Sequence, residues 1–277
     1  MNLRSALVYG KEKLQTAGVL EAENDAWLLL SHVTGVSRAA YFMEPEKELA
    51  NEQEEQYTAY IARRCERIPV QHLTGEQEFM GLTFAVNPHV LVPRQDTEVL
   101  VETVLEQLQP EMTVLDMCTG SGCILVSLMK FGSKISGTGA DVSEKALDVA
   151  EKNARSHEVQ ATFVRGDLFE NVEGTFDIIV SNPPYIPTKT IEELEAEVKL
   201  HDPFAALDGK EDGLYFYREI IKKAPQFLKK NGRLYFEIGH DQGRAVTELM
   251  EATGFTDVIV KKDLAGLDRV VFGVYNI

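Results

Sequence analysis

Apolar residues near the amino terminus recur every three or four positions, as they do along one face of an amphipathic helix. One such stretch can end at Gly18 and a second at Gly35, because glycine readily adopts the left-handed conformation found at helix ends. A further helix is predicted to begin at Asn51, with Glu54 as its capping partner. We expect residues 1–68 to form a small helical bundle. Since no residue in it suggests catalysis, we assign the bundle to substrate recognition.

The pattern then changes to an alternation of apolar and polar residues, which is typical of β-strands. Gly81 and the pair Asn87-Pro88 supply turn points within it. We therefore expect residues 69–92 to form a β-hairpin that links two domains.

From residue 93 to residue 277, helical and strand-like stretches alternate, as in a doubly wound sheet of parallel strands covered by helices. The last two strand-like stretches are expected to close the sheet as an antiparallel pair. The predicted strands are 113–117, 135–141, 162–165, 176–180, 233–238, 255–261 and 269–275. The predicted helices are 94–108, 123–130, 143–156, 213–228 and one that begins near 243.

A motif with unusual chemistry, Asn182-Pro183-Pro184-Tyr185, follows the predicted strand 176–180. Open α/β sheets bind ligands at the carboxyl ends of their strands. The Asn182 side chain offers a carbonyl acceptor, and Pro183 has a carbonyl but no N–H. Two neighbouring acceptors suit a planar –NH₂ group, and an aromatic ring can lie against its flat face. The motif predicts a pocket for an amide or for the amino group of a base, although two prolines can also simply end a strand and stiffen a turn.

A glycine-rich turn at residues 118–122 follows the first predicted strand of the sheet and leads into a helix. Such a turn lets the backbone approach a ligand, and an acidic residue about 20 positions later can bind ribose hydroxyls. Asp141 occupies that position, and Asp167 after the third strand can accept a hydrogen bond from an adenine amino group. The pattern fits an adenosine-containing cofactor, but the turn lacks the nicotinamide fingerprint. Either carboxylate can instead be solvated or cap local backbone.

These residues together make the sequence resemble the S-adenosylmethionine-dependent methyltransferases of the seven-stranded class. More narrowly, it resembles the protein-(glutamine-N5) methyltransferases that modify peptide chain release factors. The resemblance covers nearly the whole chain. Its motifs are Arg67-Ile68-Pro69, Phe79 with Gly81, Leu91 to Glu98, Asp116 to Gly122, Asn182 to Tyr185, Ala206-Leu207-Asp208-Gly209, Asp212-Gly213-Leu214, Glu237-Ile238-Gly239 and Gln242-Gly243.

The resemblance implies a class I (Rossmann-like) methyltransferase domain preceded by the helical bundle and the hairpin. It also implies methyl transfer from S-adenosyl-L-methionine, with S-adenosyl-L-homocysteine as product, to the amide nitrogen of a glutamine in a Gly-Gly-Gln motif of class 1 release factors. The residues it implies at the cofactor are Cys118, Thr119, Gly120, Ser121, Gly122, Asp141, Asp167, Leu168 and Asn182. Those it implies at the substrate are Asn182, Pro183, Pro184 and Tyr185, of which Asn182, Pro183 and Tyr185 are the expected catalytic residues.

Two positions depart from the family pattern. Relatives usually have glycine where Cys118 stands, which bears on how closely the turn approaches the methionine part of the cofactor. They often have an aromatic residue where Leu168 stands, so adenine packing is expected to be aliphatic here.

Two other functions compete with this one. The Asn-Pro-Pro-Tyr motif is shared with adenine-N6 and guanine-N2 methyltransferases, so a nucleic-acid amino methyltransferase that acts on a flipped base is the alternative enzyme. A formal net charge of −16 weighs against it, because phosphate binding depends on Lys and Arg. A nucleotide-binding protein without turnover is a third possibility, which the intact motif disfavours.

The composition narrows the setting in which the protein acts. The 277-residue chain has 44% apolar and 26% charged residues, which is ordinary for a globular protein, and it has no apolar run of transmembrane length. The three cysteines include no C-x-x-C pair, which argues against a disulfide framework and against a zinc site. We expect a cytoplasmic monomer with no metal, no membrane partner and no stable nucleic-acid partner.

Overall fold

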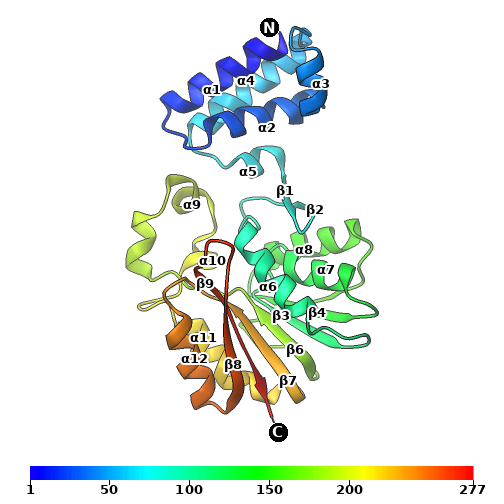
Figure 1. Cartoon of the computed structure of the whole chain (residues 1–277), viewed down its shortest axis with the longest axis vertical. Coiled ribbons are helices and arrows are strands. Elements are labelled where there is room, and N and C mark those ends of the chain that lie inside the picture. The colour runs from blue at the N-terminus through cyan, green and yellow to red at the C-terminus, as the bar shows by residue number, and fades with distance from the viewer. Residues whose placement is uncertain (277) are drawn as a thin grey trace. The chain divides into compact units, whose positions relative to one another are not determined.

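The computed structural model describes residues 1–276, and the chain divides into two compact units (Figure 1). The first unit contains Met1–Glu76 together with Glu195–His201. The second contains Gln77–Leu194 and the chain from Asp202 onward. The polypeptide therefore leaves the second unit after Leu194 and returns to it at Asp202.

The first unit is built mainly of helices, and strand β1 begins at Glu76. Its helices are α1 (Leu3–Thr16), α2 (Ala22–Thr34), α3 (Arg38–Met43), α4 (Asn51–Cys65), α5 (Val70–Thr74) and α9 (Ala196–His201). The predicted helix ends are confirmed, since Gly18 and Gly35 have φ of +74° and +68°. α3 was not predicted, because it is short and buries none of its residues.

The start of α4 differs from the expectation. Ala50, not Asn51, is the N-cap residue, and its N–H donates to Oε1 of Gln53 at 3.1 Å. The Glu54 carboxylate accepts a hydrogen bond from the amino-terminal ammonium group of Met1 instead of capping the helix.

An ion-pair cluster joins α9 to the other helices of the first unit. Arg64 Nε donates to Oδ2 of Asp25 at 2.7 Å, and Arg64 Nη2 donates to Oε1 of Glu197 at 2.8 Å. Arg67 Nη2 donates to the other oxygen of Glu197 at 2.6 Å. These arginines therefore pair within the unit, which the sequence analysis did not anticipate.

The predicted hairpin is confirmed only in its central part. β1 (Glu76–Phe79) and β2 (Leu82–Ala85) pair with each other, and both turn residues, Met80 and Gly81, have positive φ. Residues 70–74, which the hairpin prediction included, form α5 instead. Pro69 is the N-cap residue of that helix. Proline has no backbone N–H, but a residue at this position donates no hydrogen bond within the helix.

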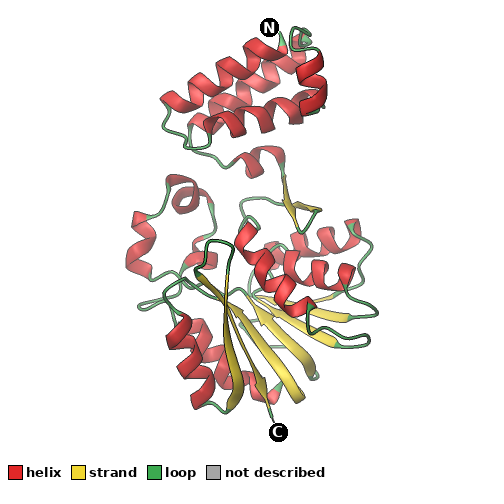
Figure 2. Ribbon diagram, in the orientation of Figure 1, coloured by secondary structure: helices red, strands yellow, loops and turns green. Residues whose placement is uncertain are grey.

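The second unit is built on a seven-stranded sheet with the order β5-β4-β3-β6-β7-β9-β8, drawn in yellow in Figure 2. All neighbouring pairs from β5 to β7 are parallel, and β9 is antiparallel to both β7 and β8. This is the predicted doubly wound sheet with an antiparallel closure. The strands are β3 (Thr113–Met117), β4 (Ser136–Asp141), β5 (Thr162–Arg165), β6 (Phe176–Ser181), β7 (Leu228–Glu237), β8 (Phe255–Lys262) and β9 (Asp268–Tyr275).

Alternate residues of the strands enter two separate cores, one on each face of the sheet. Leu115 and Ile179 pack in the core with α11 (Tyr215–Lys223) and α12 (Gly243–Ala252), whereas Ile178 packs in the other core. Figure 1 shows α11 and α12 on one side of the sheet and three helices on the opposite side. These three are α6 (Gln95–Leu105), α7 (Cys123–Phe131) and α8 (Glu144–Ser156).

The helix predicted over residues 213–228 is shorter than expected. α11 ends at Lys223, a 3-10 helix follows at Ala224–Gln226, and Leu228 begins β7. Pro225 explains the end of the helix, because proline cannot donate the backbone hydrogen bond that the next turn needs. Three short elements were not predicted: the 3-10 helix Thr188–Glu193, α9 and α10 (Phe204–Leu207).

Candidate active site

A cavity of about 190 Å³ opens in the second unit at the carboxyl ends of β3, β4 and β6. This is the edge at which parallel sheets bind ligands. Most of the residues predicted from the sequence line it, namely Cys118, Thr119, Gly120, Ser121, Asp141, Asp167, Leu168, Asn182 and Pro184. Gly122, Pro183 and Tyr185 do not line it.

The turn after β3 is shaped by three residues in the left-handed region, Cys118, Gly120 and Gly122, with φ of +63°, +55° and +78°. A Cβ on Gly120 would meet nothing within 4 Å, so the turn leaves open space at that point. A Cβ on Gly122 would lie 3.0 Å from the Cβ of Ala150, so this glycine serves the packing of α7 on α8. Burial raises the pKa of the Cys118 thiol, which therefore lines the cavity as a neutral group.

The turn is anchored from the strand below it by a buried carboxyl group. Thr119 Oγ1 donates to Oδ2 of Asp116 at 2.5 Å. Asp116 is fully buried, and burial raises its pKa to about 7, against the opposing effect of the hydrogen bond from Thr119.

Asp141 also holds the turn, through both of its carboxylate oxygens. Oδ2 accepts from the N–H of Gly120 and Oδ1 accepts from the N–H of Ser143, each at 2.9 Å. Burial raises the pKa of Asp141, and the two backbone hydrogen bonds oppose that shift. Asp141 therefore caps local backbone, which is one of the two roles expected from the sequence. The same side chain also lies on the cavity wall, and each of its oxygens has a second lone pair that can accept a further hydrogen bond.

Asp167 and Leu168 meet the cavity from the segment after β5. Asp167 is exposed and its N–H donates to Oε2 of Glu170 at 3.1 Å. Leu168 is 8% exposed and has a φ of +54°, which turns the chain at this point.

Asn182 follows the last residue of β6, and its amide group has a defined direction. Nδ2 donates to Oγ1 of Thr97 at 3.4 Å. Within residues 1–276, no side chain or backbone group donates to Asn182 Oδ1, which leaves this oxygen as an available acceptor beside the cavity.

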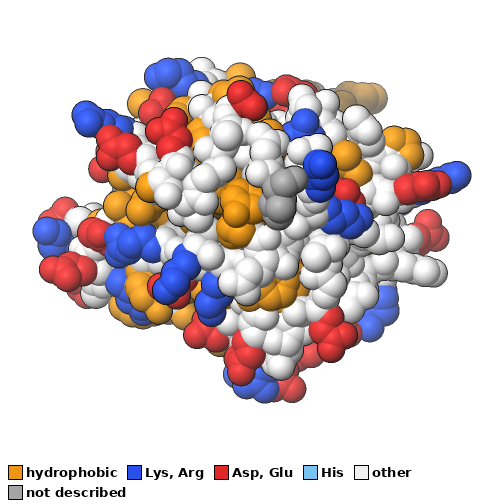
Figure 3. Space-filling model, turned by 90° about the horizontal axis from the view of Figure 1, so that it is seen from below, with side chains coloured by type: hydrophobic (Ala, Val, Ile, Leu, Met, Phe, Trp, Pro, Cys, Tyr) orange, Lys and Arg blue, Asp and Glu red, His pale blue; other side chains and the backbone are white. Residues whose placement is uncertain are grey.

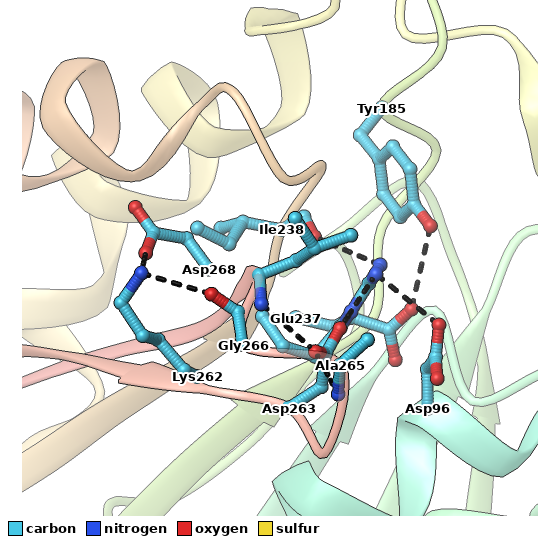
Figure 4. A network of polar contacts seen from close by, with 11 residues as sticks. Asp96, Tyr185, Glu237, Ile238, Lys262, Asp263, Ala265, Gly266 and Asp268 are labelled. Carbon is cyan, nitrogen blue, oxygen red and sulfur yellow. Dashed lines mark hydrogen bonds and ion pairs between the residues drawn. The ribbon is translucent and has the colours of Figure 1, made fainter.

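Pro184 lines the cavity next to Asn182, whereas Tyr185 is not one of the lining residues. Its hydroxyl donates to Oε1 of Glu237 at 3.4 Å, as Figure 4 shows, and burial raises its pKa. Its backbone carbonyl accepts from Nε2 of Gln242 at 3.0 Å. The motif is thus held at Tyr185 by two buried side chains from the end of β7 and the start of α12.

Several residues on the cavity wall received no role in the sequence analysis. They include Val90, Pro93, Arg94, Thr97, Ala205 and Phe216. Three of them, Pro93, Arg94 and Thr97, belong to the family motif at residues 91–98, to which the sequence assigned no function. Arg94 pairs with Asp202 at 2.7 Å, which joins that motif to the segment before α10. Phe216 carried no comparable signal.

Solved structures similar to this one share its sheet. A methyltransferase from Pyrococcus furiosus matches with a TM-score of 0.55 and 18% identity, over 79% of this chain and 98% of that chain. A 16S rRNA N2 methyltransferase of T. thermophilus, solved in complex with AdoMet and guanosine, matches with a TM-score of 0.53 and 18% identity, over 73% of this chain and 50% of that chain. At these identities the likeness shows the fold alone.

Sequence comparisons are more specific. Residues 5–75 match the family model of the PrmC N-terminal domain, and residues 94–199 match that of the methyltransferase small domain. The release factor glutamine methyltransferase of Agrobacterium fabrum is 41% identical, over 96% of this chain and 94% of that protein. That of Moorella thermoacetica is 42% identical, over 97% of both. With such identity over its full length, the chain belongs to the family of release factor glutamine methyltransferases.

Proposed function

We propose that this enzyme transfers a methyl group from S-adenosyl-L-methionine to the side-chain amide nitrogen (N5) of a glutamine in a class 1 peptide chain release factor, in its Gly-Gly-Gln motif. The observation that carries the proposal is the direction of Asn182, whose Nδ2 is used by Thr97 while Oδ1 stays available beside the cavity. An acceptor in this place suits an –NH₂ group, which is what a glutamine offers.

The residues that line the cavity suit the proposed cofactor. The glycine turn leaves open space at Gly120, the carboxylate of Asp141 lies on the wall for hydroxyl groups, and the apolar side chain of Leu168 suits the face of an adenine. Asp167 would accept from the adenine amino group, and residues 118–122 would hold the methionine portion. When bound, S-adenosyl-L-methionine supplies an electrophilic methyl group on a positively charged sulfur.

The role of the protein is to orient a poor nucleophile. The lone pair of an amide nitrogen is delocalised into the carbonyl, so alignment of the nitrogen with the methyl carbon supplies much of the acceleration. In our proposal Asn182 Oδ1 and the Pro183 carbonyl accept the two N–H groups of the substrate. Pro184 and the ring of Tyr185 pack beside the amide. The same acceptors stabilise positive charge that develops on the nitrogen, whose proton becomes acidic only after transfer, so no general base is assigned.

We also propose a division of labour along the chain. Residues 1–68 recognise the release factor, residues 69–92 link, and residues 93–277 catalyse. The match of residues 5–75 to a family-specific N-terminal domain supports the first assignment, because a general methyltransferase has no need of it.

Methyl transfer from labelled S-adenosyl-L-methionine tests the proposal. The substrates are a purified release factor, the same factor with its Gly-Gly-Gln glutamine changed to alanine, duplex DNA and ribosomal RNA. We expect label only on the unaltered factor. Label on nucleic acid instead would show that Asn182 holds the amino group of a base.

The variant Asn182→Ala tests the role proposed for Asn182. It removes the acceptor, so we expect turnover to fall by at least roughly 100-fold, the scale of losing one oriented hydrogen-bonding group at a reacting centre. Cofactor affinity, measured by calorimetry, should stay within a few-fold. A near-normal rate in this variant would reject the role given to Asn182.

A further inference from the structure

Two buried polar residues outside the Asn-Pro-Pro-Tyr motif contact its two functional side chains. Thr97 lies in the first turn of α6 and is 3% exposed, and Glu237 is the last residue of β7 and is 2% exposed. Thr97 accepts from Asn182 Nδ2, and Glu237 accepts from the hydroxyl of Tyr185, each at 3.4 Å. Burial raises the pKa of Glu237, and the neighbouring Thr97 hydroxyl opposes that shift. Oε2 of Glu237 is buried and has no hydrogen-bond partner within residues 1–276, which leaves it as an acceptor. The side chains of Asn182, Thr97, Glu237 and Tyr185 thus form one polar cluster.

A buried cation favours the charged form of Glu237. Arg269 lies on β9, next to the end of β7, and its Nη2 is 3.0 Å from Oδ2 of Asp263 and 3.1 Å from Oδ2 of Asp96. Figure 4 shows Asp96, one of these two partners, beside the carboxyl group of Glu237. The positive charge of Arg269 lowers the pKa of Glu237, against the larger effect of burial.

The chemistry of the groups in this polar cluster limits the direction of their hydrogen bonds. An ionised carboxylate only accepts, so the hydroxyl of Tyr185 donates to Glu237, and the hydroxyl of Thr97 can bond to Glu237 only as a donor. A hydroxyl has one proton, so when Thr97 donates to Glu237 it can only accept from Asn182. Asn182 must then turn its Nδ2 toward Thr97 and leave its Oδ1 for a ligand.

We propose that Thr97 and Glu237 are positioning residues, which set the direction of the hydrogen bonds around Asn182 and so present its amide oxygen to the substrate. The inference rests on the proposed function, because it concerns how the same site receives an –NH₂ group. If Thr97 could donate to Asn182 instead, the amide of Asn182 would turn over and present two N–H donors to the substrate's own donors.

Conservative variants test the inference. Glu237→Gln keeps the shape but adds an N–H donor, which can occupy the acceptor of Thr97. Thr97→Val keeps the shape and removes the hydroxyl, while Thr97→Ser retains it. We expect Glu237→Gln and Thr97→Val to lower kcat by roughly tenfold or more, as for loss of orientation at the reacting group. Thr97→Ser should keep most of the rate, and cofactor affinity should change little in all three.

Thr103→Val is the matched control. Thr103 lies on the same helix, is 1% exposed, and donates its hydroxyl to the backbone carbonyl of Val99. Its burial is similar to that of Thr97 and the substitution is the same, but its hydroxyl bonds to the helix backbone instead of to the polar cluster. We expect Thr103→Val to keep the wild-type kcat, so a general effect of deleting a buried hydroxyl would lower both valine variants equally.

The pH profile is a readout that a purely structural role would not move. Burial raises the pKa of Glu237 to about 7, and below that pH a protonated carboxyl can donate. We expect kcat of the wild-type enzyme to rise with pH through about 7, and Glu237→Gln to lack this step. The groups that face Glu237 are Thr97 and Asp96 of α6, Cys123 of α7, Tyr185, Tyr217 of α11 and Arg269 of β9.

The outcomes separate this inference from the proposed function. Absence of methyl transfer to the release factor by the wild-type enzyme overturns the proposed function and the inference with it. Normal wild-type transfer with an unchanged kcat in Thr97→Val overturns the inference alone. If Glu237→Gln does not fold, the comparison of Thr97→Val with Thr97→Ser and Thr103→Val decides the question.

Discussion

Both oxygens of Asp141 accept backbone hydrogen bonds, one from Gly120 and one from Ser143. The first bond fixes the glycine turn after β3 and the second fixes the start of α8. Asp141 therefore caps local backbone and also lies on the cavity wall. The shape of the cavity therefore depends on the same carboxylate that we expect to bind the ribose.

Replacing Asp141 by asparagine should weaken cofactor binding. The new amide must direct its –NH₂ group at one of the two backbone N–H donors, which leaves a buried donor unpaired. We expect a loss of affinity on the order of tenfold or more, which corresponds to roughly 1–3 kcal/mol. Calorimetric titration with S-adenosyl-L-methionine measures it. Asp148→Asn, an exposed position on α8, is the control, and equal affinities in the two variants would contradict the assignment.

At Tyr185 the ring and the hydroxyl can be tested separately. Phenylalanine loses one long hydrogen bond to Glu237, whereas alanine also removes the ring, which we propose to pack beside the substrate amide. We therefore expect Tyr185→Phe to retain more methyl transfer activity than Tyr185→Ala. The reverse order in a kcat comparison would mean that the hydroxyl, not the ring, has the main role.

At the scale of elements, periodic patterns were sufficient to predict the sheet. The strand Thr162–Arg165 and the helix Glu144–Ser156, which is capped by Ser143, follow local patterns in the sequence, and the structure confirms them. The segment between Tyr185 and Gly213 has no such pattern. Its short elements depend on distant contacts, for example the N–H of Ile186 donating to the carbonyl of Leu207 at 3.0 Å.

In the site, too, local patterns predicted residues within one motif but not the contacts between distant segments. Residues on one motif, such as Asn182, could be proposed from their chemistry, because neighbours in sequence are neighbours in space. The contact of Asn182 with Thr97 joins residues 85 positions apart, and that of Tyr185 with Glu237 joins residues 52 positions apart. No local pattern reports such pairs, so they required the structure.

Gly213 shows how the distant contacts shape the motif loop. Its φ is +73°, and a Cβ there would lie 2.3 Å from the carbonyl oxygen of Tyr185 and 2.7 Å from Nε2 of Gln242. We expect Gly213→Ala to displace Tyr185 and lower kcat by roughly tenfold or more, while cofactor affinity changes little. Steady-state methyl transfer assays measure the effect.

Gly266→Ala is the control for that variant. Gly266 also has a positive φ, +80°, but a Cβ there would meet nothing within 4 Å. It therefore adds backbone strain without a clash. Equal losses of activity in the two variants would show that strain in general, not the approach to Tyr185, is responsible.

At the scale of the whole molecule, the charge balance is strongly acidic. The formal net charge is −16. On the face drawn in Figure 3, acidic and basic side chains are interspersed over the surface. This charge balance supports the proposed protein substrate, whose recognition does not depend on a large basic surface. Within residues 1–276, no helix has the length and apolarity to cross a bilayer.

Buried carboxyl groups make the stability of the fold depend on pH. Burial raises the pKa of Asp116 from 3.8 to about 7, so the folded state binds a proton more tightly than the unfolded state does. The stability that this proton contributes is present at low pH and is lost as the pH rises toward 7. Asp116→Asn removes the ionisation, so its unfolding free energy relative to wild type should increase by about 2–3 kcal/mol between pH 5 and pH 8.

Urea denaturation at the two pH values measures that difference, with the exposed Asp148→Asn as the reference. A constant difference between Asp116→Asn and wild type would mean that Asp116 is already ionised in the folded protein at pH 5.

The return of the chain to the first unit at Glu195–His201 has a consequence for biosynthesis. Glu197 is made 133 residues after Arg64 and 130 residues after Arg67, the two arginines that it pairs with. Proteins emerge from the ribosome starting at the amino terminus, and early domains often fold first. Here the two guanidinium groups lack this carboxylate partner until strands β3 to β6 have been translated. The amino-terminal unit is thus begun first and completed only after β6 has been synthesised.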